Sequence, residues 1–119
     1  MNLQWSKLRK LNKEELNEVP STAGVYRLSY RSAEGSIYVF YIGKADISLK
    51  DSILNHLGSK ENNTCIKTYL TNLECYFRYA EVANKDERLN CEKSLYVHYS
   101  PKCNLDVPKG KIIEDLNFS

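Results

Sequence analysis

The chain lacks any long hydrophobic run. None of its apolar stretches approaches the roughly 20 residues that cross a bilayer, and its polar start, Met1–Lys7, lacks the apolar stretch of a secretion signal. No composition shift, internal repeat or low-complexity segment divides the 119 residues. We therefore expect one domain, residues 1–119, in a cytoplasmic protein that makes no contact with membranes.

Closely spaced cysteine pairs are also missing. The four cysteines are Cys65, Cys75, Cys91 and Cys103, and no two of them form a C-x-x-C pair. This wide spacing disfavours a zinc site, because zinc-binding cysteines usually come in such pairs. Widely spaced cysteines are typical of free thiols in a reducing compartment. The sequence therefore predicts four free thiols.

An excess of charge of one sign is absent as well. The chain has 17 Lys and Arg against 15 Asp and Glu, a net charge of +2, which does not by itself indicate nucleic-acid binding. Two local basic clusters stand out: Lys7, Arg9, Lys10 and Lys13, and Lys102, Lys109 and Lys111. Either cluster is a candidate for contact with a phosphate backbone. Solvated surface is the more frequent explanation of such clusters.

Periodicity and chain-breaking residues predict alternating helices and strands. Helices are expected at about residues 12–18, 48–57, 63–72 and 84–99, strands at 25–30, 37–42 and 74–82, and one short element near 111–116. The polar loop 31–36 joins the first two strands into a hairpin. The expected fold class is α+β, with a small, mainly antiparallel three-stranded sheet flanked by helices.

Two tripeptides lie on the predicted hairpin, Gly24-Val25-Tyr26 on its first strand and Tyr41-Ile42-Gly43 on its second. Alternation along a strand places each tyrosine with every second neighbour: Tyr26 with Leu28 and Tyr30, and Tyr41 with Val39 and Ile37. The two tyrosines then face one cleft, provided that the hairpin register is right. We expect Gly24 to allow a close approach of the chain and Gly43 to let it turn out of the strand. The alternative is that both tyrosines are ordinary packing residues.

The pair of tripeptides resembles the paired signature of the GIY-YIG nuclease family, and Lys44 fits the usual continuation of the second motif. Three later landmarks of that family follow in order. His56 lies on the helix after the second motif, Glu92 lies in the middle of the last predicted helix, and Asn104 closes the pattern. The resemblance covers about residues 22–104 and implies a GIY-YIG type of fold.

The resemblance implies hydrolysis of DNA phosphodiester bonds with Mg²⁺ or Mn²⁺. It makes Glu92 the metal ligand, Tyr26 the general base, and Tyr41 and His56 assisting groups, with Asn104 steadying the site. One carboxylate is enough to hold such a metal, because these ions keep several waters and also bind substrate phosphate. The implied partner is nucleic acid, and a protein partner or a second copy of the chain is a further expectation.

Two of these residues also have simpler explanations. His56 is near a helix end, where a histidine can contact the last backbone carbonyls. Glu92 lies one helical turn after Arg88, and the alternative is an ion pair between the two on the helix surface.

One landmark of the family is missing. Its essential arginine lies one helical turn before the histidine, where this sequence has Ser52. Serine cannot supply a charged, two-pronged donor to phosphate. The nearby or distant cations that could substitute are Lys44, Lys50, Arg78 and Arg88. Two functions follow: an endonuclease of weak activity, or the same fold without turnover, acting as a nucleic-acid-binding or protein-interaction module.

Overall fold

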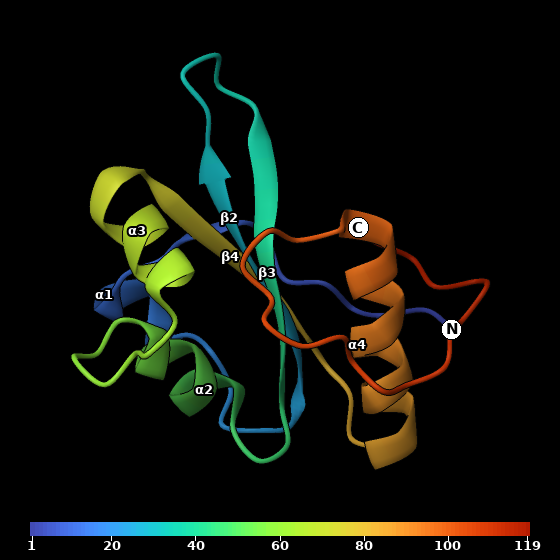
Figure 1. Ribbon diagram of the computed structural model, residues 1–119. Helices are drawn as coiled ribbons and strands as arrows, with labels where there is room; N and C mark the ends of the chain where they lie inside the picture. Colours follow the sequence, from blue (N-terminus) through green and yellow to red (C-terminus); the bar gives the residue numbers. More distant parts are fainter.

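The computed structural model describes all residues from Met1 to Ser119, and a four-stranded antiparallel sheet lies at its centre (Figure 1). The strands are β1 (Arg9–Lys10), β2 (Gly24–Arg31), β3 (Ile37–Ala45) and β4 (Cys75–Glu81), in the order β1-β4-β2-β3. The helices are α1 (Lys13–Leu16), α2 (Leu49–His56), α3 (Thr64–Asn72) and α4 (Lys85–Tyr99). The predicted α+β class, an antiparallel sheet flanked by helices, is confirmed.

The sheet contains one strand more than the sequence predicted. The additional strand, β1, has only two residues and pairs with the outer edge of β4, with Arg9 opposite Phe77 and Lys10 opposite Tyr76. Two residues carry no alternating pattern, so periodicity could not reveal this strand. It forms because β4 has a free edge that the N-terminal segment can pair with.

Side-chain caps begin all the helices. Asn12, Ser48, Asn63 and Asn84 each accept a hydrogen bond from the backbone N–H three residues later. These caps satisfy N–H groups that have no partner inside the helix, which is why each helix begins directly after its polar cap. The longest helix, α4, has 15 residues, and none of the helices has both the length and the apolar composition of a membrane span.

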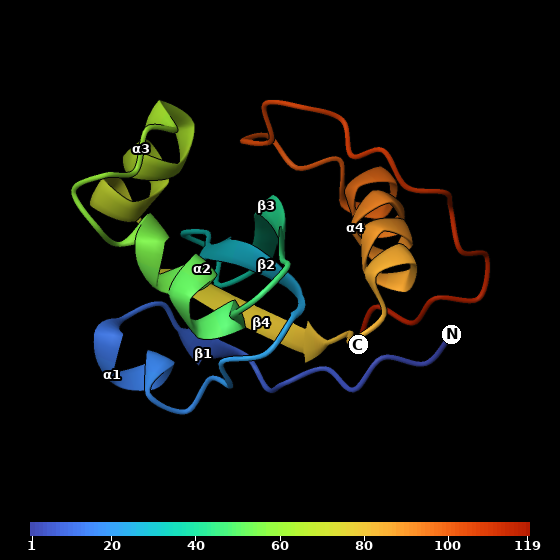
Figure 2. The same cartoon turned by 90° about the horizontal axis from the view of Figure 1, so that it is seen from below.

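Helices cover both faces of the sheet. Leu16, Ile53 and Ile66 of α1, α2 and α3 pack in a cluster on one face, whereas Cys91 and Leu95 of α4 pack on the other. Figure 2 shows α4 on the opposite side of the sheet from α2 and α3. Because both faces are covered, the first six residues of β2 are buried without interruption. This central strand is therefore a rigid support for a functional side chain.

A bulge interrupts the alternation of β3. Leu28 of β2 pairs with Tyr41, but the next residue, Ser29, pairs with Val39, so Phe40 is an extra residue in the ladder. Phe40 and Tyr41 both pack on the side of α2 and α3, whereas Val39 packs on the side of α4. The prediction that Tyr41 shares a face with Val39 is therefore wrong. The bulge, rather than regular alternation, brings Tyr41 to its observed face.

The predicted short element at 111–116 is absent, because the tail runs along α4 and bonds to its side chains. Lys111 N donates to Asn90 Oδ1 at 2.8 Å, and Ile113 N donates to Ser94 Oγ at 2.8 Å. These N–H groups are thus satisfied by α4 and are not available for a helix or strand of their own.

The two ends of the chain lie on the same side of the molecule (Figure 1). Asn117 Oδ1 accepts a hydrogen bond from Leu3 N at 2.6 Å, and Asn117 Nδ2 donates to Leu3 O at 2.9 Å. Trp5 Nε1 adds a bond to Asn117 O at 3.1 Å. The Asn117 side-chain amide thereby bonds to both the N–H and the carbonyl of Leu3, as a neighbouring strand would.

Candidate functional site

Tyr26 lies on the buried part of β2, and its side chain is almost enclosed. The residue is 3% exposed, and its ring lies over Gly43 of β3, where an added Cβ would be 2.3 Å from Tyr26 Cζ. Gly43 is therefore needed to make room for the tyrosine. The prediction that it turns the chain out of the strand is wrong, because β3 continues to Ala45. Gly24 does provide the predicted close approach, since a Cβ there would lie 2.3 Å from Ala80 O.

His56, the last residue of α2, lies against both motif tyrosines. Its ring centroid is 5.7 Å from that of Tyr26 and 5.1 Å from that of Tyr41, and the two tyrosine centroids are 6.3 Å apart. A hydrogen bond of 2.7 Å joins His56 Nε2 to Tyr26 Oη. The alternative in which His56 contacts the last carbonyls of its helix is wrong, because both of its ring nitrogens bond to other side chains.

Glu61, which the sequence analysis missed, extends this hydrogen-bonded chain. Its Oε2 accepts from His56 Nδ1, and its Oε1 accepts from Asn63 N at 2.9 Å. The side chains of His56 and Glu61 are only 11% and 12% exposed, so water competes little for their contact. Glu61 lies in the loop between α2 and α3, where no periodicity applies. Its spacing of five residues from His56 was the only available signal.

Glu92 lies in the middle of α4 and faces a cavity of about 280 Å³. The cavity is lined by Tyr41, Asn63, Glu92, Asn104, Leu105, Asp106, Val107 and Pro108. Burial raises the pKa of the Glu92 carboxyl, although the charge of Lys44 opposes this effect. Glu92 has no hydrogen-bond or ion-pair partner in the protein. A half-buried carboxylate without a bonded partner therefore faces the same cavity as Tyr41.

The surface ion pair that offered a simpler explanation of Glu92 does not form. Arg88 is buried and turns to other partners: its Nε donates to Asp46 Oδ1 at 3.1 Å and its Nη1 to Val82 O at 2.9 Å. These contacts join the start of α4 to the end of β3. Arg88 is thus occupied in holding the fold, and it cannot replace the missing arginine of the site.

The two tyrosine hydroxyls are protonated near neutral pH. Burial raises the pKa of Tyr26 well above its usual value, and the charges of Tyr41, Glu61 and Glu92 raise it further. Burial also raises the pKa of Tyr41, with a further contribution from Glu92. Tyr26 can therefore take a proton from another molecule only if it passes its own proton on, and its hydrogen-bonded neighbour for that transfer is His56.

Asn104 holds the segment after α4 against the edge of β3. Its Oδ1 accepts from Ile42 N at 2.9 Å, and its Nδ2 donates to Ile42 O at 2.8 Å. The preceding residue, Cys103, donates its N–H to Phe40 O at 2.8 Å. Because backbone groups occupy both ends of the Asn104 amide, this side chain fixes the cavity wall formed by residues 104–108.

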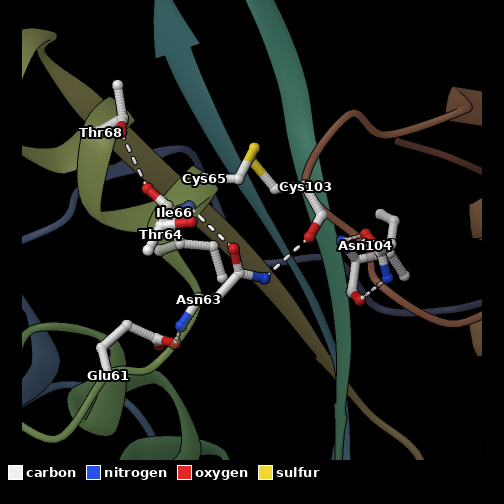
Figure 3. The surroundings of a disulfide bond; sticks show 9 residues. Glu61, Asn63, Thr64, Cys65, Ile66, Thr68, Cys103 and Asn104 are labelled. Carbon is white, nitrogen blue, oxygen red and sulfur yellow. Dashed lines mark hydrogen bonds between the residues drawn. A yellow bond between two sulfur atoms is a disulfide. The ribbon is translucent and has the colours of Figure 1, made fainter.

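A disulfide joins Cys65 of α3 to Cys103 (Figure 3). The prediction of four free thiols is therefore wrong, and only Cys75 and Cys91 are free, both buried. The pairing spans 38 residues, so it depends on a meeting of α3 with the segment after α4 that spacing alone does not indicate. Disulfides are typical of oxidising compartments, which counts against the reducing compartment inferred from free thiols. The cytoplasmic location stays a prediction.

We expect the disulfide to contribute about 2–4 kcal/mol to the free energy of unfolding, because it closes a long loop in the unfolded chain. Urea unfolding with and without a reductant measures this contribution through the midpoint. The matched control is the double variant Cys65→Ser, Cys103→Ser, whose midpoint the reductant should leave unchanged. A midpoint of the wild type that does not move on reduction would contradict the prediction.

No arginine reaches the site. Ser52 lines a separate hollow of about 300 Å³ that also contains Asp46. Arg78 donates its Nε to a backbone carbonyl of the N-terminal segment at 2.7 Å, which holds its side chain away from Tyr26. Lys44 is close enough for its charge to act on Glu92, although its Nζ also lies 2.7 Å from Asp46 Oδ2.

Comparison with known proteins identifies no relative of this chain. No family model, curated protein or solved structure matches it. The GIY-YIG resemblance therefore depends on the motif residues of the sequence alone.

Proposed function

We propose that this chain is a GIY-YIG-type, metal-dependent DNA endonuclease domain of weak activity. The observation that carries the proposal is the convergence of side chains from distant segments: Tyr41 lies against His56 on one side and lines the cavity of Glu92 on the other. A hydrolase of phosphodiesters needs an activated water, a stabilised phosphoryl charge and help for the departing 3′-oxygen. The residues around Tyr41 offer groups suited to the first and third of these needs.

Glu92 is the proposed ligand of Mg²⁺ or Mn²⁺. These ions prefer oxygen ligands, and one or two carboxylates with several waters suffice to hold them. The unpaired carboxylate of Glu92, with Asp106 in the same cavity, fits that chemistry. When bound, the metal would polarise the scissile phosphate and stabilise the negative charge on the departing oxygen.

Tyr26 and His56 are the proposed pair that handles the proton of the attacking water. Water gives its proton to Tyr26 Oη while the phenolic proton moves to His56 Nε2, 2.7 Å away. Because Tyr26 is 3% exposed, the attacking water would reach its hydroxyl past Tyr41 when DNA is bound. Tyr41, which lines the cavity, would donate a hydrogen bond to the phosphate.

A second candidate function is binding without turnover, and the missing guanidinium favours it. Ser52 occupies the position of the family's arginine, and Arg78 and Arg88 are held by other partners. Lys44 supplies a point charge without the planar fork that matches phosphate. The two functions are separated by incubating the protein with supercoiled plasmid or branched DNA in Mg²⁺ or Mn²⁺, with Glu92→Ala as the control for contaminating nucleases.

We expect DNA binding to weaken steeply with salt, mainly through the C-terminal basic cluster. Lys102, Lys109 and Lys111 are exposed and have no ion-pair partner. In the N-terminal cluster, Arg9 pairs with Glu15 at 2.9 Å and Lys10 with Glu74 at 3.5 Å. Binding isotherms at several salt concentrations measure the effect, and glutamine at the three C-terminal lysines should flatten the slope by about one unit per phosphate contact.

The matched control replaces Arg9 and Lys10 of the N-terminal cluster by glutamine, and it should change the slope less because Glu15 and Glu74 already pair with these two cations. Affinity that does not depend on salt would contradict phosphate contact. No binding at low salt and high protein concentration would favour a protein-interaction role instead.

A further inference from the structure

We propose that Glu61 is a positioning residue that fixes the tautomer of His56 and thereby gives Tyr26 a proton acceptor. The inference deepens the endonuclease proposal, and its mechanistic part rests on that proposal. Its basis is the continuous hydrogen-bonded chain from Tyr26 Oη through both nitrogens of His56 to the Glu61 carboxylate. No motif of the sequence pointed to Glu61.

The chemistry of the three groups sets the direction of the hydrogen bonds. An ionised carboxylate only accepts, so the Nδ1 of His56 that bonds to Glu61 must carry the hydrogen. A neutral imidazole has a single N–H, so its Nε2 is then an acceptor. The Tyr26 hydroxyl, 2.7 Å away, donates to it. The carboxylate thus determines which nitrogen can receive the phenolic proton.

Glu61 itself is held in place by the cap of α3 (Figure 3). Its Oε1 accepts from Asn63 N at 2.9 Å, and the Asn63 side chain accepts from Ile66 N at 3.1 Å while donating to Cys103 O at 2.8 Å. The loop is therefore anchored both to α3 and to the segment that the disulfide secures. A carboxylate fixed in this way needs no reorganisation when its partner becomes charged.

In the reaction, the hydrogen-bonded side chains of Tyr26, His56 and Glu61 would act as a two-step proton path. The phenolic proton moves from Tyr26 to His56 Nε2 as the water proton moves to Tyr26 Oη, so Tyr26 stays neutral. His56 becomes an imidazolium, and the Glu61 carboxylate beside Nδ1 stabilises the new positive charge. Glu61 touches neither water nor phosphate in this scheme. Its effect passes entirely through His56.

The first test reads the tautomer directly, independently of any nuclease activity. Long-range proton–nitrogen NMR spectra of ¹⁵N-histidine-labelled protein near neutral pH distinguish a protonated Nδ1 from a protonated Nε2. The chain contains two histidines, so a His98→Gln variant assigns the signals. We expect wild-type His56 to be the Nδ1–H tautomer and Glu61→Gln to lose this single form. The exposed Glu34→Gln is the matched control and should leave it unchanged.

Two results of this test would overturn the proposal. One is a wild-type His56 that carries its hydrogen on Nε2 only, or a hydrogen on each of its two ring nitrogens. The other is an unchanged Nδ1–H tautomer in Glu61→Gln, with backbone signals showing that the variant is folded.

The second test measures nicking in protein that carries Ser52→Arg. Glu61→Gln should lower the rate about 100-fold, the lower end of what general acid–base catalysis contributes, whereas Glu34→Gln should not change it. Glu61→Asp, which keeps the charge, should recover part of the loss. If Glu61→Gln loses the Nδ1–H tautomer of His56 but keeps the full nicking rate, the proposed role of Glu61 is refuted. If no variant nicks DNA, the endonuclease proposal fails, and the NMR result alone decides the tautomer.

Discussion

Replacing Ser52 by arginine should raise Mg²⁺-dependent nicking of plasmid DNA by about 10²–10³-fold, the usual effect of one charged contact to a transition state. Ser52 is half-buried on α2, one helical turn before His56, so an arginine there starts from the same helix as that histidine. Its guanidinium would supply the two-pronged donor that the site lacks. Asp46 lies in the same hollow, but its carboxylate already bonds to Arg88 and Lys44.

Two variants of the same helix serve as controls for Ser52→Arg. Ser52→Lys adds a charge without the planar fork and should gain less, and Asn55→Arg adds the same group at an exposed position of the same hollow. A wild type as active as Ser52→Arg, and dependent on Glu92, would show that Lys44 already fills the role. If both proteins are inactive although Mn²⁺ still binds, the binding module replaces the endonuclease as the function.

Glu92→Ala should abolish divalent-metal binding in the cavity and lower nicking by Ser52→Arg protein about 10³-fold. The size of the loss in nicking rate follows from the several kcal/mol that a bound metal contributes to charge stabilisation. The fold should persist, because the Glu92 carboxylate is half-buried and makes no bond that alanine would break. Calorimetric titration with Mn²⁺ measures the binding, and the unfolding midpoint measures the stability.

Glu87→Ala, an exposed carboxylate on the same helix, is the matched control and should bind Mn²⁺ like the wild type. Undiminished Mn²⁺ binding by Glu92→Ala would place any metal elsewhere in the molecule. Unchanged nicking by that variant would indicate a contaminating nuclease or a reaction in which Glu92 takes no part.

Most regular elements of the fold follow from local patterns in the sequence. The hairpin of β2 and β3 was predicted from strand-forming residues around a polar loop, and α4 from helical spacing. Such signals are local and need no knowledge of the rest of the fold. The features that the sequence did not predict are of another kind. The pairing of β1, the bulge at Phe40 and the Cys65–Cys103 bond each depend on contacts between distant segments.

The site shows the same division. The motifs singled out Tyr26, Tyr41 and His56, and the structure brings them together because β2, β3 and α2 follow one another in the chain and pack directly. Glu61 was missed because a loop carboxylate has no pattern, and its role follows only from where the cap of α3 holds it. The arrangement of Glu92 was also beyond prediction, since part of its cavity wall is a segment that follows α4.

The pairing of Asn104 with Ile42 also affects how copies of this protein can meet. β3 is the last strand of the sheet, and an uncovered strand edge invites another chain to add to it, which is a common route to aggregation. Along Phe40–Ile42, Cys103 and Asn104 take up the outward-facing backbone groups and act as a substitute neighbour. Two molecules therefore cannot join their sheets through Phe40–Ile42.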